Sequence, residues 1–120
     1  MVDEGTLATS AQVLLAIGEN ATAAQVLEAN TNIWIKMAES DMEKEFDGIG
    51  LVTNYATITA SYKQWLAKIA VAGASIEGIN QDPNSWGLAT TQTKLNVHTT
   101  TWEKGLKDLT DEDVIARLGL

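Results

Sequence analysis

The segment YATITASYKQWLAKIAVAGASI, residues 55–76, contains the clearest helical pattern in the chain. Its large apolar residues recur at steps of three, four or seven, the spacing that places side chains on one face of an α-helix. They are Tyr55, Ile58, Tyr62, Trp65, Ile69 and Ile76. Alanine, serine and glycine fill many positions between them, so a neighbouring helix could approach closely. We therefore predict a helix from Tyr55 to about Gly78 whose stripe packs in a domain core.

A helix start signal lies near the beginning of the chain. Thr9 and Gln12 have capping-box spacing, in which each side chain satisfies a backbone N–H at the helix start. Gly18 follows a short apolar pattern and suits a helix end. These signals predict a short first helix between Thr9 and Gly18.

A second capping-box pattern, Thr22 to Gln25, predicts a long helix that ends near Gly48. Its expected apolar residues are Val26, Leu27, Ile33, Trp34, Met37, Met42 and Phe46. Charged residues lie between them, including Glu39 and Glu43, and we expect these to form a solvated face.

A loop at residues 80–85 holds the one proline of the chain and should break the helical pattern. A further helix is expected from Trp86 or Leu88 to Leu109, and a short last helix begins at Thr110. There is no strong strand alternation. We predict an all-α fold, a small bundle of four to five helices with a long second helix and a short C-terminal helix. Residues 1–109 would form the helical domain, and residues 110–120 a short C-terminal docking segment.

Composition limits the function. The chain has 120 residues, of which 45% are hydrophobic, which fits one globular domain. It has no cysteine, so disulfides, thiolate catalysis and cysteine-type zinc sites are excluded. No apolar run approaches about 18 residues, and the acidic N-terminus is unlike a signal peptide. The net charge of −8 disfavours nonspecific binding to nucleic acid or an anionic membrane surface. This negative charge would suit a basic partner protein, or it could serve only to keep the protein soluble.

The sequence contains few motifs that indicate catalysis, metal binding or cofactor binding. His98 is the one histidine, and no metal-binding spacing surrounds it. Glu39 and Glu43 share a helix face and could hold a divalent ion, but a solvated face explains them better. The glycines form no phosphate-binding loop, and no nucleophile elbow is present. We therefore expect no catalytic residue, no metal site and no cofactor, and we expect that the chain is not an enzyme.

Two regions are candidate protein interfaces instead. Trp86 follows the proline loop and lies off any clear apolar stripe, and tryptophan is enriched at interface hot spots. The C-terminal segment is too short to be stable alone, and it combines an acidic cluster with aliphatic residues. Its candidate anchors are Val114, Ile115, Leu118 and Leu120.

Four segments together resemble the small helical head–tail adaptor (connector) proteins of tailed bacteriophages. They are NIWIKMAE (residues 32–39), TASYKQWLAKIA (residues 59–70), ATTQTKLNV (residues 89–97) and WEKGLKDL (residues 102–109). The resemblance covers roughly residues 9–110. His98 and the threonines at positions 99–101 depart from the pattern, and the family has no catalytic residues to carry over.

The resemblance implies a structural protein of the virion neck, assembled in the host cytoplasm. Such proteins form a ring of about twelve copies beneath the portal protein and connect it to stopper or tail proteins. DNA passes through the ring without sequence-specific binding. Two alternatives remain open from the sequence: a free-standing helical module that binds one partner protein, and a noncatalytic subunit of an enzyme.

Overall fold

The computed structural model describes residues 5–18, 25, 27–45, 51–52, 54–81 and 88–111. Over these residues the elements are α1 (Ser10–Ile17), α3 (Glu28–Glu45), the 3-10 turn η1 (Tyr55–Thr57), α4 (Ala60–Gln81) and α5 (Leu88–Asp108). None of these residues forms a strand. The predicted all-α helical bundle is therefore confirmed.

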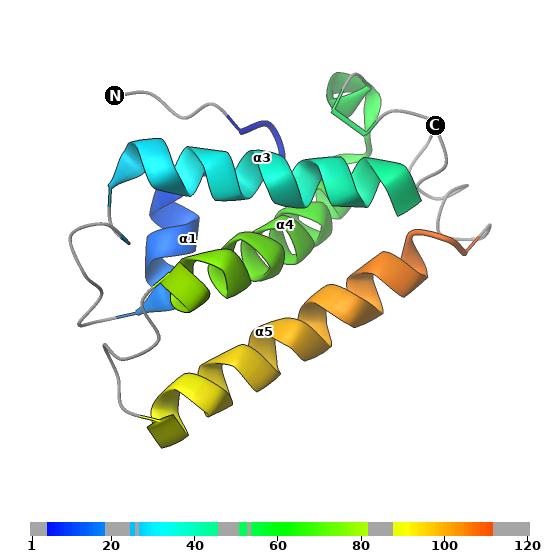
Figure 1. Ribbon diagram of the computed structural model, residues 1–120. Helices are drawn as coiled ribbons and strands as arrows, with labels where there is room; N and C mark the ends of the chain where they lie inside the picture. Colours follow the sequence, from blue (N-terminus) through cyan, green and yellow to red (C-terminus); the bar gives the residue numbers. More distant parts are fainter. Residues whose placement is uncertain are drawn as a thin grey trace.

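Helix α4 is the centre of the bundle. In Figure 1 it runs between α3 and α5, and α1 packs against both α4 and α3. Two glycines allow α4 and α5 to approach closely. A Cβ atom at Gly73 would lie 2.6 Å from Trp102 Cζ3, and one at Gly105 would lie 2.5 Å from Ile69 Cγ1. Small residues at these crossing points thus let the Trp102 ring and the Ile69 side chain lie directly against the opposing backbone.

The first helix forms as its local signals predict. The Thr9 hydroxyl accepts from the Gln12 N–H at 3.3 Å, and the Gln12 side-chain oxygen accepts from the Thr9 N–H at 2.9 Å. Gly18 ends the helix with φ of 93°, a value that favours glycine, and its N–H donates to Leu14 O. Val13 and Ile17 point into the core and are fully buried.

The buried face of α3 differs from the predicted one. Ile33 and Met37 were expected in the core, but they are 53% and 45% exposed. Trp34, as expected, is buried. Several unpredicted residues join it and Met42 on the buried face: Thr31, Asn32, Ile35, Ala38 and Glu39. The prediction failed because polar residues occupy part of the buried face, so hydrophobicity alone selected the wrong face. The predicted start at Thr22 lies outside the described residues, and α3 begins at Glu28.

The predicted third helix is divided. Tyr55 belongs to η1, Ile58 is extended with φ of −68° and ψ of 139°, and α4 begins only at Ala60. Ile58 and Ile69 are buried as predicted, whereas Trp65 is only half-buried at the edge of the core. The expectation that the whole stripe is core was therefore too broad.

Helix α4 also continues to Gln81, beyond the predicted end near Gly78. Gly78 does not end the helix but allows neighbouring side chains to pack against it, because a Cβ atom there would lie 2.7 Å from Ile17 Cδ1. The neighbouring side chains of α1 and α3 occupy the space above its backbone. Leu66 and Ile79, which the predicted stripe omitted, are fully buried on this helix.

The bounds of α5 agree with the sequence. The helix spans Leu88–Asp108, and Leu109 just beyond it is fully buried. The candidate interface residues Trp86, Val114, Ile115, Leu118 and Leu120 lie outside the described residues, as does most of the predicted docking segment. No helix in the described ranges is both long and apolar enough to cross a membrane.

Candidate functional site

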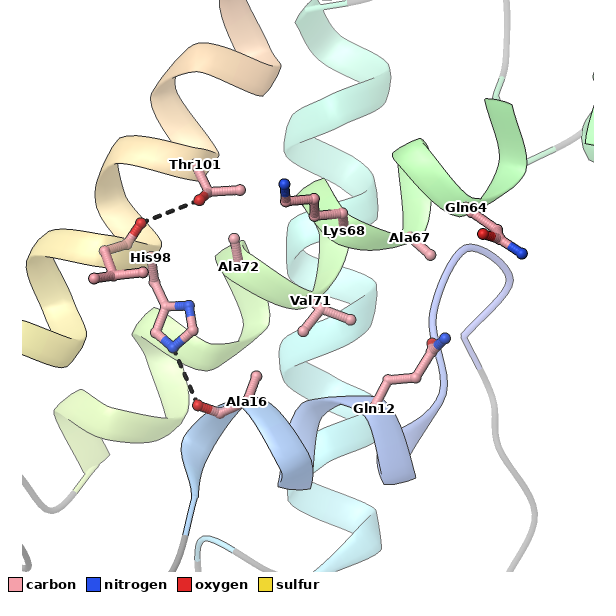
Figure 2. A pocket seen from close by; sticks show the side chains of 10 residues that line it. Gln12, Ala16, Gln64, Ala67, Lys68, Val71, Ala72, His98 and Thr101 are labelled. Carbon is pink, nitrogen blue, oxygen red and sulfur yellow. Dashed lines mark hydrogen bonds between the residues drawn. The ribbon is translucent and has the colours of Figure 1, made fainter. Parts of the chain in front are cut away.

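The largest hollow described on the molecule lies between α1, α4 and α5 and has a volume of about 530 Å³ (Figure 2). Its apolar floor consists mainly of small side chains, and polar groups line its edges. The lining residues are Gln12, Ala16, Gln64, Ala67, Lys68, Val71, Ala72, Val97, His98 and Thr101. Val97 is 58% exposed although it is aliphatic. The hollow can therefore accept apolar groups of a partner within a polar frame.

Two side chains of α5 contact the C-terminal end of α1, and one of them, His98, lines this hollow. Lys94 Nζ donates a hydrogen bond of 2.7 Å to Ile17 O, and His98 Nε2 lies 3.2 Å from Ala16 O. Figure 2 shows the imidazole of His98 pointing from α5 toward Ala16. The last carbonyls of a helix have no partner inside the helix, so these contacts satisfy them. They also place a positive charge at the negative end of the α1 dipole.

His98 is a structural donor in this arrangement. Burial lowers the pKa of His98 below its ordinary value of 6.5, the hydrogen bond to Ala16 opposes this shift, and the positive charge of Lys94 adds to it. The ring is therefore neutral at pH 7, and Nε2–H donates to Ala16 O. None of the residues that line this hollow is a carboxylate, so His98 has no acidic partner there.

Two smaller hollows adjoin the first. One, of about 280 Å³, shares Lys68 and Thr101 with it and extends to Trp65 and Lys104. The other, of about 200 Å³, shares Gln12, Gln64 and Ala67 and extends to Lys63. The Lys63 ammonium lies 4.6 Å from the centroid of the Tyr55 ring. We call the three hollows together the basic groove.

The basic groove has an unusual charge for this chain. Lys63, Lys68 and Lys104 line it, and Asp108 is the one carboxylate among the described residues that line it. The whole chain, in contrast, has 16 acidic and 8 basic residues. A positive rim on a negative protein is an electrostatic feature that would select acidic partners.

A cleft between α3, α4 and α5 has the opposite character. It has a volume of about 220 Å³, and its charged lining residues are Asp41 and Glu77. Met37, Ile76 and Trp102 supply its apolar surface. We call it the acidic cleft. The described residues therefore form one apolar depression with a basic rim and another with an acidic rim.

Glu39 has a role that the sequence did not indicate. Its side chain is 6% exposed, and Oε2 accepts the N–H groups of Thr6 at 2.7 Å and Leu7 at 2.5 Å. Burial raises the pKa of Glu39 above its ordinary value of 4.5, although the two hydrogen bonds lower it in part. The prediction of a solvated Glu39 is wrong, because this carboxylate anchors the chain that precedes α1 to α3.

Glu43 also accepts a backbone hydrogen bond, from the Val52 N–H at 2.8 Å. Glu39 and Glu43 thus bind two different backbone segments rather than converging on one point. In the described part of the chain, no group of three or more histidine, cysteine, aspartate or glutamate residues is placed to hold a metal ion.

The fold and these depressions define an all-α helical bundle with an open apolar groove between three of its helices. No family model, curated protein or solved structure matches the chain.

Proposed function

We propose that this protein is a structural head–tail adaptor of a tailed phage virion. In this role, copies of the chain assemble into a ring that connects the portal protein to stopper or tail proteins. The resemblance of residues 32–39, 59–70, 89–97 and 102–109 to adaptor proteins motivates the proposal. These segments lie on α3, α4 and α5 and in the short stretches that flank them.

The observation that carries the proposal is the exposure of large aliphatic side chains on several helices. Leu15 on α1 is 84% exposed, Val97 on α5 is 58% exposed, and Ile33 on α3 is 53% exposed. Burying one such side chain in an interface is worth roughly 1.5–3 kcal/mol before ordering costs. Such residues on three different helices fit a subunit that contacts other chains better than a free monomer.

The charge distribution supports the same proposal. A basic groove on an acidic chain allows a head-to-tail contact, in which the groove of one copy meets a different, acidic surface of the next. A head-to-tail contact closes into a ring when its rotation fits a whole number of copies. The net charge of −8 would also keep DNA moving through the channel, because like charges do not attract.

A second function, a free-standing module that binds one partner protein, is favoured by the basic groove considered alone. The groove is large enough for one helix or peptide and does not itself require a ring. The two functions differ in stoichiometry. A module would bind its partner one to one, whereas an adaptor would assemble in many copies on the portal.

The experiment combines the chain with the portal protein encoded in the same genome. We expect co-purification of the two proteins and rings of about twelve copies in negative-stain micrographs. Sedimentation of the chain alone is the control, since adaptor copies can remain monomeric before they meet the portal. A chain that neither co-purifies with the portal nor forms rings in its presence would rule out the adaptor function.

A further inference from the structure

We propose that the basic groove binds residues 110–120 of a second copy of this chain. The inference deepens the proposed function, since it rests on self-assembly and names the contact that joins neighbouring copies. The groove lies between α1, α4 and α5, and the segment follows directly after α5 in the sequence.

The shape and polarity of the groove suit an aliphatic segment. Small side chains such as Ala67 and Ala72 leave its floor open, and Val71 and Val97 provide apolar contact surface. The segment TDEDVIARLGL, residues 110–120, carries valine, isoleucine and leucine. Aliphatic anchors in a small-residue groove are the usual mode by which helical proteins bind short segments.

Charge complementarity selects this segment. Lys68 and Lys104 are exposed and line adjoining hollows of the groove. The segment begins with three consecutive acids, Asp111 to Asp113, and has one opposing charge at Arg117. Of the other titratable groups that line the groove, Lys63 adds positive charge, Asp108 is negative, and His98 is neutral at pH 7. The aliphatic anchors directly follow the acids, so one segment offers both features that the groove requires.

Distance favours a second copy over the same chain. The N–H of Asp111 donates to Asp108 O at 3.1 Å, so this residue is held at the end of α5. His98 lies about 17 Å back along the helix from Leu109, at about 1.5 Å per residue. Val114 and Ile115 follow Asp111 by three and four residues, which span only about 10–14 Å when fully extended. Val114 and Ile115 therefore cannot reach the His98 end of the groove on their own chain, whereas the same two residues of a neighbouring copy can.

A peptide-binding experiment tests the groove. The full chain carrying Val114→Asp and Ile115→Asp keeps its groove and loses two of its four candidate anchors. Fluorescence anisotropy with a labelled peptide of residues 110–120 should show saturable binding below about 1 mM. Adding Val97→Asp or Lys68→Glu should weaken that binding by about tenfold or more. The matched controls Met37→Asp and Lys44→Glu, at exposed positions of α3, should change it by less than about twofold.

A mixing experiment then separates two copies from one. A Val97→Asp chain has a blocked groove and an intact segment. The Val114→Asp/Ile115→Asp chain has an intact groove and an altered segment. Each alone should sediment as a monomer, and an equimolar mixture should give a dimer that grows no further. A mixture that stays monomeric at concentrations well above the Kd of the peptide would show that the segment does not join two copies and would overturn the inference.

The outcomes distinguish this inference from the proposed function. Absence of peptide binding, or equal binding to the Val97→Asp variant, overturns the groove contact even if rings form on the portal. Peptide binding and dimerisation of the mixture without any assembly on the portal would support the contact and reject the adaptor function.

Discussion

Glu39 is a buried carboxylate that stabilises the fold through backbone hydrogen bonds while its charge is costly. Its oxygen binds two consecutive N–H groups, of Thr6 and Leu7. A glutamine has an oxygen in the same place but no charge. We expect Glu39→Gln to match or exceed the stability of the natural protein at pH 7, and Glu39→Ala to lose about 1–3 kcal/mol for the orphaned donors. Urea melts of the three proteins would measure this.

The pH dependence gives an independent check on Glu39. Since the pKa of Glu39 is raised above 4.5, the folded state holds its proton more tightly than the unfolded state. The stabilisation that the folded state gains from this tighter proton binding is complete below the ordinary pKa of glutamate. It is lost as the pH rises through the raised pKa of Glu39. The stability difference between Glu39→Gln and the natural protein should therefore shift in favour of glutamine between about pH 4 and 7. A difference that is constant with pH would contradict a raised pKa.

At the scale of elements, the crossing of α4 and α5 depends on close contacts at glycine. A Cβ atom at Gly105 would lie 2.5 Å from Ile69 Cγ1 and 2.8 Å from its Cδ1. We expect Gly105→Ala to destabilise the fold by about 1–2 kcal/mol, because overpacking outweighs the better helix propensity of alanine. Thermal or urea melts measure the change.

The control for this prediction shortens the opposing side chain. Ile69→Val removes one methyl group and should cost about 0.5–1.5 kcal/mol alone. The double variant should lose less unfolding free energy than the sum of the two single losses, since valine makes room for the new Cβ atom. Additive losses would mean that Gly105 does not limit the approach of the two helices.

Helix α1 is stabilised by local contacts at its start and also by tertiary contacts at its end. The capping box at Thr9 and Gln12 begins it, and both residues lie in the same short stretch of chain. Its end depends also on α5, because Lys94 donates to Ile17 O. A Cβ atom at Gly18 would lie 2.6 Å from Lys94 Nζ, so the glycine also leaves room for that lysine.

For the molecule as a whole, Leu109 is the last core residue in the described part of the chain. This residue is fully buried, whereas Thr110 and Asp111 are exposed. We expect a chain truncated after Leu109 to melt within about 3 °C of the full chain but to fail to assemble, since the buried contacts remain while the docking segment is lost. Calorimetry and sedimentation are the two measurements. A collapsed melt, with assembly that follows only the folded fraction, would place the segment in the core instead.

Features that depend on neighbouring residues could be predicted from the amino-acid sequence. The start of α1 at Thr9, its end at Gly18 and the bounds of α5 follow from caps and breakers within a few positions. The all-α class follows from the repeated helical spacing. Local hydrogen bonds and backbone preferences are encoded locally, so these predictions needed no knowledge of the rest of the chain.

The buried helix faces and the position of the groove, in contrast, depend on how the helices pack together. Glu39 appears in a charged run, yet it is buried because the chain before α1 supplies two N–H donors to it. Ile33 and Met37 are apolar, yet exposed, because the buried face of α3 is formed mainly by other residues of that helix. The basic groove joins Gln12, Lys68 and His98 from three helices. No local pattern encodes their proximity, because the packing of whole helices sets it and many residues share the energy of that packing.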